Sequence, residues 1–355
     1  MVFDAAGAVG LFILQSKDQR ILALDGLRGI AALSVVLQHF ATQAPWHERT
    51  FIWSGMVGVQ LFFVLSGFLM GRIYSTAPLS RSAVADFWVR RAARVLPLFL
   101  ICVTIGYAYL WLTGHNMPFY GLQWQGWWMH YVFWDGQSVF WTIPREVQFY
   151  LIFPLIWWLC QRLGNAANFL LLGAIAVLQT DGIMYPVFMQ AAPLFIAGVI
   201  AGRMNLEADK SYDVPFVALL VLFVLSWPGL IDVTGLPKSL YGNISQGTLY
   251  LIYLPALVLV STASPLAQRM LGRGVLKRYG DMSYSVYLLH LPIFSALMLW
   301  TPLPHLPRAV FFGLMLGLVT LVSHYSFRYL ETPLRRWITS LPDRPKRALA
   351  LPAAA

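Results

Sequence analysis

The chain has 355 residues, of which 58% are hydrophobic and only 11% are charged. A soluble domain carries about 25% charged residues, so this composition excludes an ordinary water-soluble domain. The formal net charge of +10 does not indicate nucleic-acid binding, because the basic residues gather in the segments between long apolar runs.

Apolar runs of membrane-spanning length recur along the whole sequence. They predict an all-α, polytopic membrane protein with about ten transmembrane helices. We expect one transmembrane domain at residues 1–340 and a short cytoplasmic tail at 341–355. The runs lie near residues 24–41, 54–71, 95–113, 141–160, 167–180, 187–202, 214–231, 247–262, 282–300 and 308–330.

The distribution of Lys and Arg predicts the orientation of these spans. With the N-terminus inside, 19 of these residues fall in inner segments and two, Arg49 and Lys238, fall in outer segments. The bias fits the positive-inside rule with both termini in the cytoplasm. The two cysteines, Cys102 and Cys160, lie inside apolar runs, so we expect buried core residues and no metal site.

The first apolar run carries a cation near one end, Arg28, and an imidazole near the other, His39. Eleven residues separate them, about 16 Å along a helix. That is about half the thickness of the hydrocarbon core of a bilayer. A cation at one depth and a base at another would hold the two ends of a long substrate.

The predicted topology places His39 and Glu146 at a similar depth, toward the outer side, on two different helices. Ionisable residues inside a membrane are costly and usually face a cavity or each other. A carboxylate beside an imidazole orients the ring and stabilises its protonated form. The alternative is that both groups lie at the interface and never meet.

A basic segment at residues 87–97 precedes the third apolar run. Arg90, Arg91 and Arg94 lie at its inner end, and Arg28 reaches the same face. Several guanidinium groups together can bind a phosphorylated cytosolic ligand through bidentate hydrogen bonds. The alternative is that these charges only set the topology and attract anionic lipid.

Five segments, in order, resemble the membrane acyltransferase-3 family. The resemblance covers about residues 22–335. The segments are LDGLRGI at 24–30 followed by His39, GVQLFFVLSGF at 58–68, FWVRRAARVLP at 87–97, WTIPREVQFY at 141–150 and GDMSYSVYLLH at 280–290.

This resemblance implies transfer of an acyl group, often acetyl, from cytosolic acyl-coenzyme A to a hydroxyl of an extracytoplasmic or lipid-linked acceptor, commonly a glycan. It implies that His39 is the catalytic base and that Glu146 is its partner. The implied donor-binding residues are Arg28, Arg90, Arg91, Arg94, Tyr284 and His290. We expect direct transfer in a ternary complex; the alternative is a transient acyl-histidine.

Aromatic residues gather in the outer segment at 114–141. They predict either an interfacial belt or a platform for sugar rings formed by Trp127 and Trp128, with Asp135 as a polar contact. By position, Tyr150, Gln148 and Tyr284 are candidate donors to the developing oxyanion.

The sequence thus predicts an O-acetyltransferase of the bacterial cytoplasmic membrane that uses acetyl-CoA or another acyl-CoA and no metal. Expected partners are acyl-CoA, a glycan or lipid-linked sugar and membrane lipid, without nucleic acid; the oligomeric state, a homo-oligomer included, stays open. The rival functions are transport of a phosphorylated or acidic solute and acylation of a macrolide-like molecule.

Overall fold

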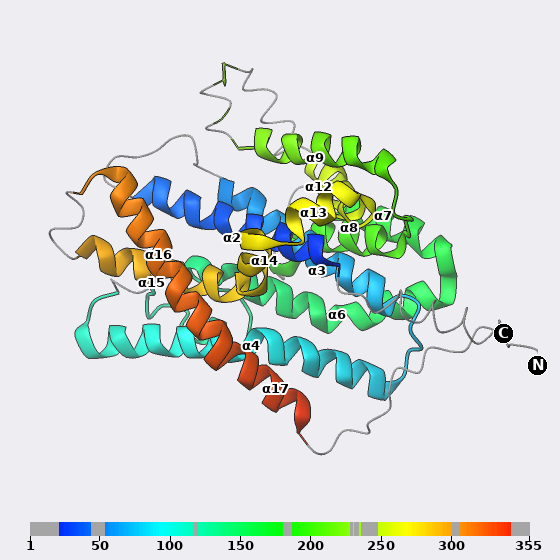
Figure 1. Cartoon of the computed structure of the whole chain (residues 1–355). Helices are drawn as coiled ribbons and strands as arrows, with labels where there is room; N and C mark the ends of the chain where they lie inside the picture. Colours follow the sequence, from blue (N-terminus) through cyan, green and yellow to red (C-terminus); the bar gives the residue numbers. More distant parts are fainter. Residues whose placement is uncertain are drawn as a thin grey trace, which may run out of the picture.

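The structure is a computed structural model that describes residues 21–43, 54–116, 120–179, 187–227, 230, 234–235, 248–299 and 306–341. Within these ranges all regular structure is helical, which confirms the predicted class (Figure 1). The longer helices are α2 (Leu22–Gln43), α3 (Ser54–Tyr74), α4 (Arg81–Thr113), α6 (Thr142–Leu163), α7 (Ala167–Leu178), α8 (Ala192–Arg203), α9 (Asp213–Leu225), α12 (Tyr250–Ala263), α15 (Ser283–Leu299) and α16 (Arg308–Ser326). The shorter ones include α5 (Trp128–Tyr131), α13 (Pro265–Leu271), α14 (Gly274–Asp281) and α17 (Thr332–Ser340).

Each of the predicted apolar runs overlaps one of the longer helices. By length and composition, four helical stretches can cross a membrane: Ser54–Tyr74, Arg81–Thr113, Ser138–Leu178 and Arg308–Ser340. Two helix pairs, α12 with α13 and α14 with α15, are bent by 95° and 81° and bring the number to six if each pair is one span. The protein is therefore a multi-pass membrane protein, while the number of ten spans and their orientation stay predictions. Only the first residue of the predicted tail, 341–355, lies within the described residues.

Helices α3 and α8 touch through their backbones. A Cβ atom on Gly198 or Gly202 of α8 would meet the carbonyl oxygen of Val64 or Phe68 in α3. Gly67 of α3 meets the backbone of α8 in the same way. Small residues four positions apart, as Gly198 and Gly202 are, let two helices approach closely in a membrane. There, packing rather than the hydrophobic effect drives helix association. The spacing at Gly313 and Gly317 in α16 has no such role, because a Cβ there would meet nothing within 4 Å.

Helix α2 is held by a second set of close contacts, against α14. A Cβ on Gly29 would meet the backbone of Leu276, and a Cβ on Gly280 would meet the backbone of Asp25. These contacts join the first and the last of the predicted motifs. Arg28, one residue before Gly29, is therefore carried on a helix whose position is fixed by backbone contacts.

Helix α4 begins well before the predicted run at residue 95. Ser80 caps its N-terminus, since its Oγ accepts a hydrogen bond of 3.1 Å from the amide of Ala83. Gly114 ends it in the left-handed conformation, with φ of 70° and an amide that donates to Leu110 O. The basic segment thus lies inside a helix. Cys102, on the same helix, is buried and free, as is Cys160.

Candidate active site

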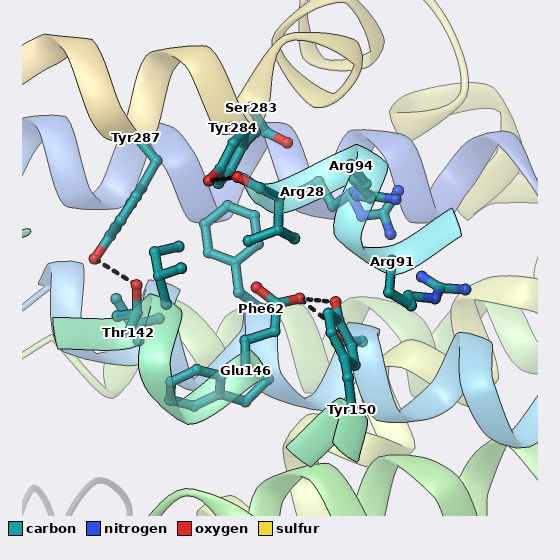
Figure 2. A pocket seen from close by; sticks show the side chains of 15 residues that line it. Arg28, Phe62, Arg91, Arg94, Thr142, Glu146, Tyr150, Ser283, Tyr284 and Tyr287 are labelled. Atoms are coloured by element: carbon teal, nitrogen blue, oxygen red, sulfur yellow. Dashed lines mark hydrogen bonds between the residues drawn. The ribbon is translucent and has the colours of Figure 1, made fainter. Parts of the chain in front are cut away.

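A cavity lies among α2, α3, α4, α6 and the start of α15 and encloses about 660 Å³, open solvent at its mouth included (Figure 2). Three guanidinium groups line it, those of Arg28, Arg91 and Arg94. Three of the four arginines in the predicted donor site therefore come together.

The arginines of the cavity differ in how they are held. Arg28 Nη1 lies 3.8 Å from Asp25 Oδ1. The guanidinium carbon of Arg91 lies 5.8 Å from the ring centroid of Phe87 and 5.8 Å from that of Tyr150. Within the described residues, Arg94 has no hydrogen bond or ion pair. Its donors are thus available to an anionic ligand.

Arg90 does not line the cavity. Its Nε lies 2.6 Å from Asp86 Oδ2, one helical turn earlier, and its side chain is 58% exposed. Residues 91 and 94 share a face of α4, because positions three apart on a helix are neighbours. Arg90 lies to one side of that face and belongs to a solvated ion pair.

Glu146 lies in the same cavity as the arginines. Its Oε1 accepts hydrogen bonds from Tyr150 Oη and from Ser66 Oγ, the latter at 3.1 Å. Tyr150 in turn lies under the guanidinium of Arg91 (Figure 2). The structure thus places Glu146 with the arginines, rather than apart from them as the predicted topology had it.

Two further tyrosines of α15 line the cavity. Tyr284 Oη donates a hydrogen bond of 2.6 Å to Val95 O. Tyr287 Oη donates to Val139 O at 2.8 Å and accepts from Thr142 Oγ1 at 3.1 Å. The ring of Tyr287 lies 6.3 Å from that of His290, centroid to centroid. Tyr287 therefore stands between the arginine cavity and a buried histidine.

The catalytic candidate His39 lies beside His290. Their ring centroids are 5.0 Å apart and their planes are inclined by 42°. The predicted contact between His39 and Glu146 stays a prediction. His39 is not among the side chains that line the arginine cavity, and the described hydrogen bonds of Glu146 go to Ser66 and Tyr150.

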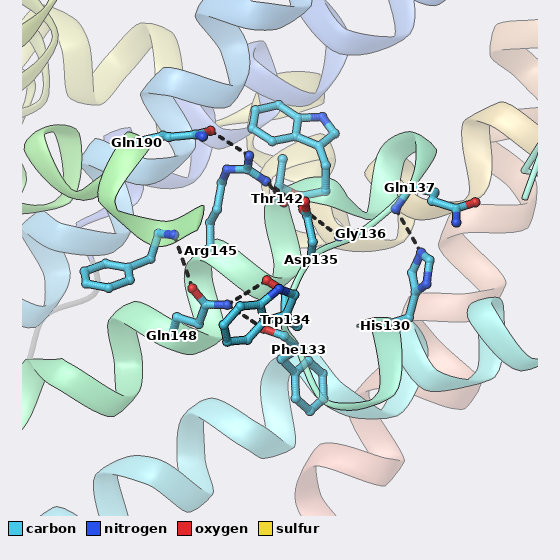
Figure 3. A network of polar contacts seen from close by, with 12 residues as sticks. His130, Phe133, Trp134, Asp135, Gly136, Gln137, Thr142, Arg145, Gln148 and Gln190 are labelled. Carbon is cyan, nitrogen blue, oxygen red and sulfur yellow. Dashed lines mark hydrogen bonds and ion pairs between the residues drawn. The ribbon is translucent and has the colours of Figure 1, made fainter. Parts of the chain in front are cut away.

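The outer segment is anchored to α6 through Arg145 (Figure 3). Arg145 Nη2 donates to Gln190 Oε1 at 2.8 Å, and Nη1 donates to Trp141 O at 2.6 Å and to Asp135 Oδ1 at 3.5 Å. Asp135, a predicted substrate contact, is thus engaged with Arg145. A buried guanidinium needs such partners, so this network is part of the fold.

Gln148 holds the same segment at a second point. Its Nε2 donates to Phe133 O at 2.6 Å and to Trp134 O at 3.0 Å, and its Oε1 accepts from the amide of Phe188 at 3.2 Å. Both donors of this amide are engaged, which favours a structural role over oxyanion stabilisation. Trp127 and Trp128 are 49% and 46% exposed, so they are available either to lipid or to a sugar.

His130 is buried in the outer segment and was not singled out from the sequence. Its Nε2 accepts a hydrogen bond of 2.9 Å from the amide of Gln137 (Figure 3). Its Nδ1 lies 3.3 Å from Tyr107 Oη. Burial lowers the pKa of His130 below its ordinary value. The neutral ring is thus part of the structure of this segment.

Sequence reasoning also passed over Ser66, Thr142, Tyr287 and Glu331. The first three lie within the motifs quoted above, and their polar character in apolar runs was the available signal. Glu331 ends the π-helical turn η8 (Phe327–Glu331) and is buried, where its Oε2 accepts a hydrogen bond of 3.0 Å from Ser285 Oγ. An acidic residue directly after the last apolar run was the signal there.

Comparison with known proteins agrees with the predicted resemblance. The chain is 25% identical to the peptidoglycan O-acetyltransferase OatA of Listeria monocytogenes over 88% of its length, and 25% identical to the O-acetyltransferase OatA of Staphylococcus aureus over the same share. It is 26% identical, over 92% of its length, to the putative O-acetyltransferase SACOL0978 of Staphylococcus aureus.

The chain spans only 56% to 59% of the length of these relatives. No solved structure matches the chain. The family model described as an acyltransferase domain matches residues 21–327, which include the cavity, His39 and His290. This match covers most of the sequence, and the chain therefore belongs to the acyltransferase-3 family.

Proposed function

We propose that the chain is a membrane O-acetyltransferase that moves an acetyl group from cytosolic acetyl-CoA to a hydroxyl of an extracytoplasmic or lipid-linked glycan. Family membership and the names of the relatives support this activity. The observation that carries it is the cavity in which Arg28, Arg91 and Arg94 face one another. Three cations share the cavity with one lining carboxylate, that of Glu146, so a bound anion would lower the cost of gathering these like charges.

The donor would bind with its phosphates on these three arginines. Guanidinium groups form bidentate hydrogen bonds with phosphate, and Arg94 has donors to offer. Glu146, fixed by the hydroxyls of Ser66 and Tyr150, would order the arginines around the ligand. In this proposal Glu146 acts on the donor site.

The pantetheine arm would extend from the arginines past Tyr287 toward His290 and His39. Arg28 and His39 lie on the same helix, about 16 Å apart by helical rise. That separation suits the long, flexible arm between the phosphates and the thioester of coenzyme A. The bend of 81° between α14 and α15 brings Tyr284 and Tyr287 to the path of the arm.

His39 would act as the general base in direct transfer. It takes the proton of the acceptor hydroxyl as the hydroxyl oxygen attacks the thioester carbonyl, and coenzyme A leaves as its thiolate. Of the predicted oxyanion donors, Tyr150 and Tyr284 line the cavity, whereas the amide of Gln148 is engaged with the outer segment. A transient acyl-histidine is the alternative, and a stable label on His39 after incubation with labelled acetyl-CoA alone would favour it.

The acceptor would approach from the outer segment. Trp127 and Trp128 are exposed there, and aromatic faces pack well against sugar rings. One relative is named for acetylation of peptidoglycan, so a peptidoglycan precursor or strand is the first acceptor to test. We place the protein in the bacterial cytoplasmic membrane with both termini in the cytoplasm, in accord with the distribution of basic residues.

The test compares a deletion strain complemented with the wild-type chain, with His39→Gln, or with nothing. Mass spectrometry of cell-wall and surface glycans measures ester-linked acetyl groups, and immunoblotting of membranes checks that both proteins are present. We expect acetylation with the wild type only. Full acetylation with His39→Gln would refute the proposal, and unchanged glycans in the deletion strain would favour the transport function or a small-molecule acceptor.

A further inference from the structure

His290 is buried in α15 and lies next to the proposed catalytic base. Its side chain is 1% exposed, and its ring centroid lies 5.0 Å from that of His39 on α2. The nearest titratable group on its own helix is Tyr287, at 6.3 Å between ring centroids. A buried ionisable side chain inside a membrane protein is costly and calls for a specific partner.

The hydrogen bonds of His290 define which of its nitrogens is a base. Nδ1 lies 3.1 Å from the carbonyl oxygen of Val286, which can only accept, so Nδ1 carries the proton. In the neutral ring, Nε2 is then left with a lone pair. That atom is buried and has no hydrogen-bond partner within the described residues. An unsatisfied buried acceptor of this kind calls for a functional explanation.

We propose that His290 positions His39 by accepting a hydrogen bond at Nε2 from the imidazole N–H of His39. This inference rests on the proposed function. A separation of 5.0 Å between ring centroids is short enough for a ring nitrogen of His39 to come within hydrogen-bond distance of His290 Nε2. Once one nitrogen of His39 donates to His290, its other nitrogen is fixed as the base.

With this hydrogen bond in place, the proton of the acceptor hydroxyl can be followed through the reaction. The O–H bond of the acceptor breaks, and its proton forms a new N–H bond at the basic nitrogen of His39. The lone pair of His290 Nε2 stabilises the resulting imidazolium through the hydrogen bond on the other side of the ring. The proton later passes to the thiolate of the departing coenzyme A, and both histidines return to their starting state.

Two variants separate this role from a merely structural one. In His290→Gln the side-chain amide oxygen can accept a hydrogen bond near the position of Nε2, whereas His290→Leu has no acceptor. We expect kcat of His290→Leu to be about a hundredfold below the wild-type value, the size of effect that follows loss of general-base assistance. We expect kcat of His290→Gln to lie close to the wild-type value. The midpoint of thermal unfolding in detergent, measured on both purified full-length variants, should stay near the wild-type value and serves as the check of folding.

NMR spectroscopy can test the pairing of the two histidines without acetyl-CoA or an acceptor. Long-range ¹⁵N–¹H NMR spectra of histidine-labelled full-length protein, assigned with His290→Gln, should show His290 as the Nδ1–H tautomer with Nε2 accepting a hydrogen bond. An Nε2–H tautomer would overturn the pairing whatever the activity. An active wild type whose leucine variant is equally active, or whose glutamine variant is as inactive as leucine, would also overturn it. The pairing seen by NMR in a wild type that transfers no acetyl group would refute the proposed function alone.

Discussion

Arg94 offers the sharpest test of the donor site. It lines the cavity, and within the described residues it makes no hydrogen bond or ion pair, although its charge attracts the buried carboxylate of Glu331. In Arg94→Gln we expect the loss of one charge-assisted contact to phosphate, which contributes about 1.5–3 kcal/mol. Since about 1.4 kcal/mol is tenfold in affinity, Kd for acetyl-CoA should rise roughly tenfold to a hundredfold.

The matched control is Arg90→Gln. Arg90 lies four positions earlier on the same helix, but it is exposed and paired with Asp86 outside the cavity. Titration calorimetry on the detergent-solubilised protein would measure acetyl-CoA and S-acetylpantetheine, which lacks the nucleotide phosphates. We expect Arg94→Gln to weaken binding of acetyl-CoA only and Arg90→Gln to change neither. Wild-type affinity of Arg94→Gln for acetyl-CoA, or equal losses in both variants, would refute the assignment of the cavity to the donor phosphates.

Three more outcomes follow from the described contacts. Gly202→Leu should destabilise the protein by about 1–3 kcal/mol through overpacking against α3, while Gly313→Leu should leave thermal unfolding in detergent unchanged. Burial lowers the pKa of His130 in the folded protein, so below a pH of about 6.5 this histidine takes up a proton more readily in the unfolded chain than in the folded one. The free energy of unfolding should therefore fall as the pH falls. His130→Gln should weaken this pH dependence, measured by thermal unfolding. Trp127→Leu with Trp128→Leu should spare folding and weaken acceptor binding in a glycan titration; unchanged acceptor affinity would leave these rings with a membrane-interface role.

The sequence predicted the helices well because each apolar run must satisfy its own backbone in lipid. Apolarity alone did not predict the sharp bends at which α12 meets α13 and α14 meets α15. The prediction from sequence also began α4 too late, because the count of apolar residues ignored the cap at Ser80. That error placed the arginines at a membrane surface rather than inside a helix that faces the cavity.

Some features of the candidate site follow from local sequence spacing, whereas others arise only from the packing of distant helices. Helical spacing alone favours Arg91 and Arg94 on one face and pairs Arg90 with Asp86 on another. No local pattern predicts that His39 lies beside His290, because their motifs are about 250 residues apart and meet only through packing. The roles of these residues in catalysis and donor binding stay predictions until the variants are measured.

The glycine contacts have a mechanical consequence. Helices that touch through backbone atoms cannot slide when a side chain changes rotamer, so α8 and α3 move as one body, as do α2 and α14. The other walls of the cavity, α4, α6 and α15, present side chains to it. We therefore expect any widening that admits the proposed nucleotide donor to come from movement of α4, α6 and α15, not from the helices that touch through their backbones.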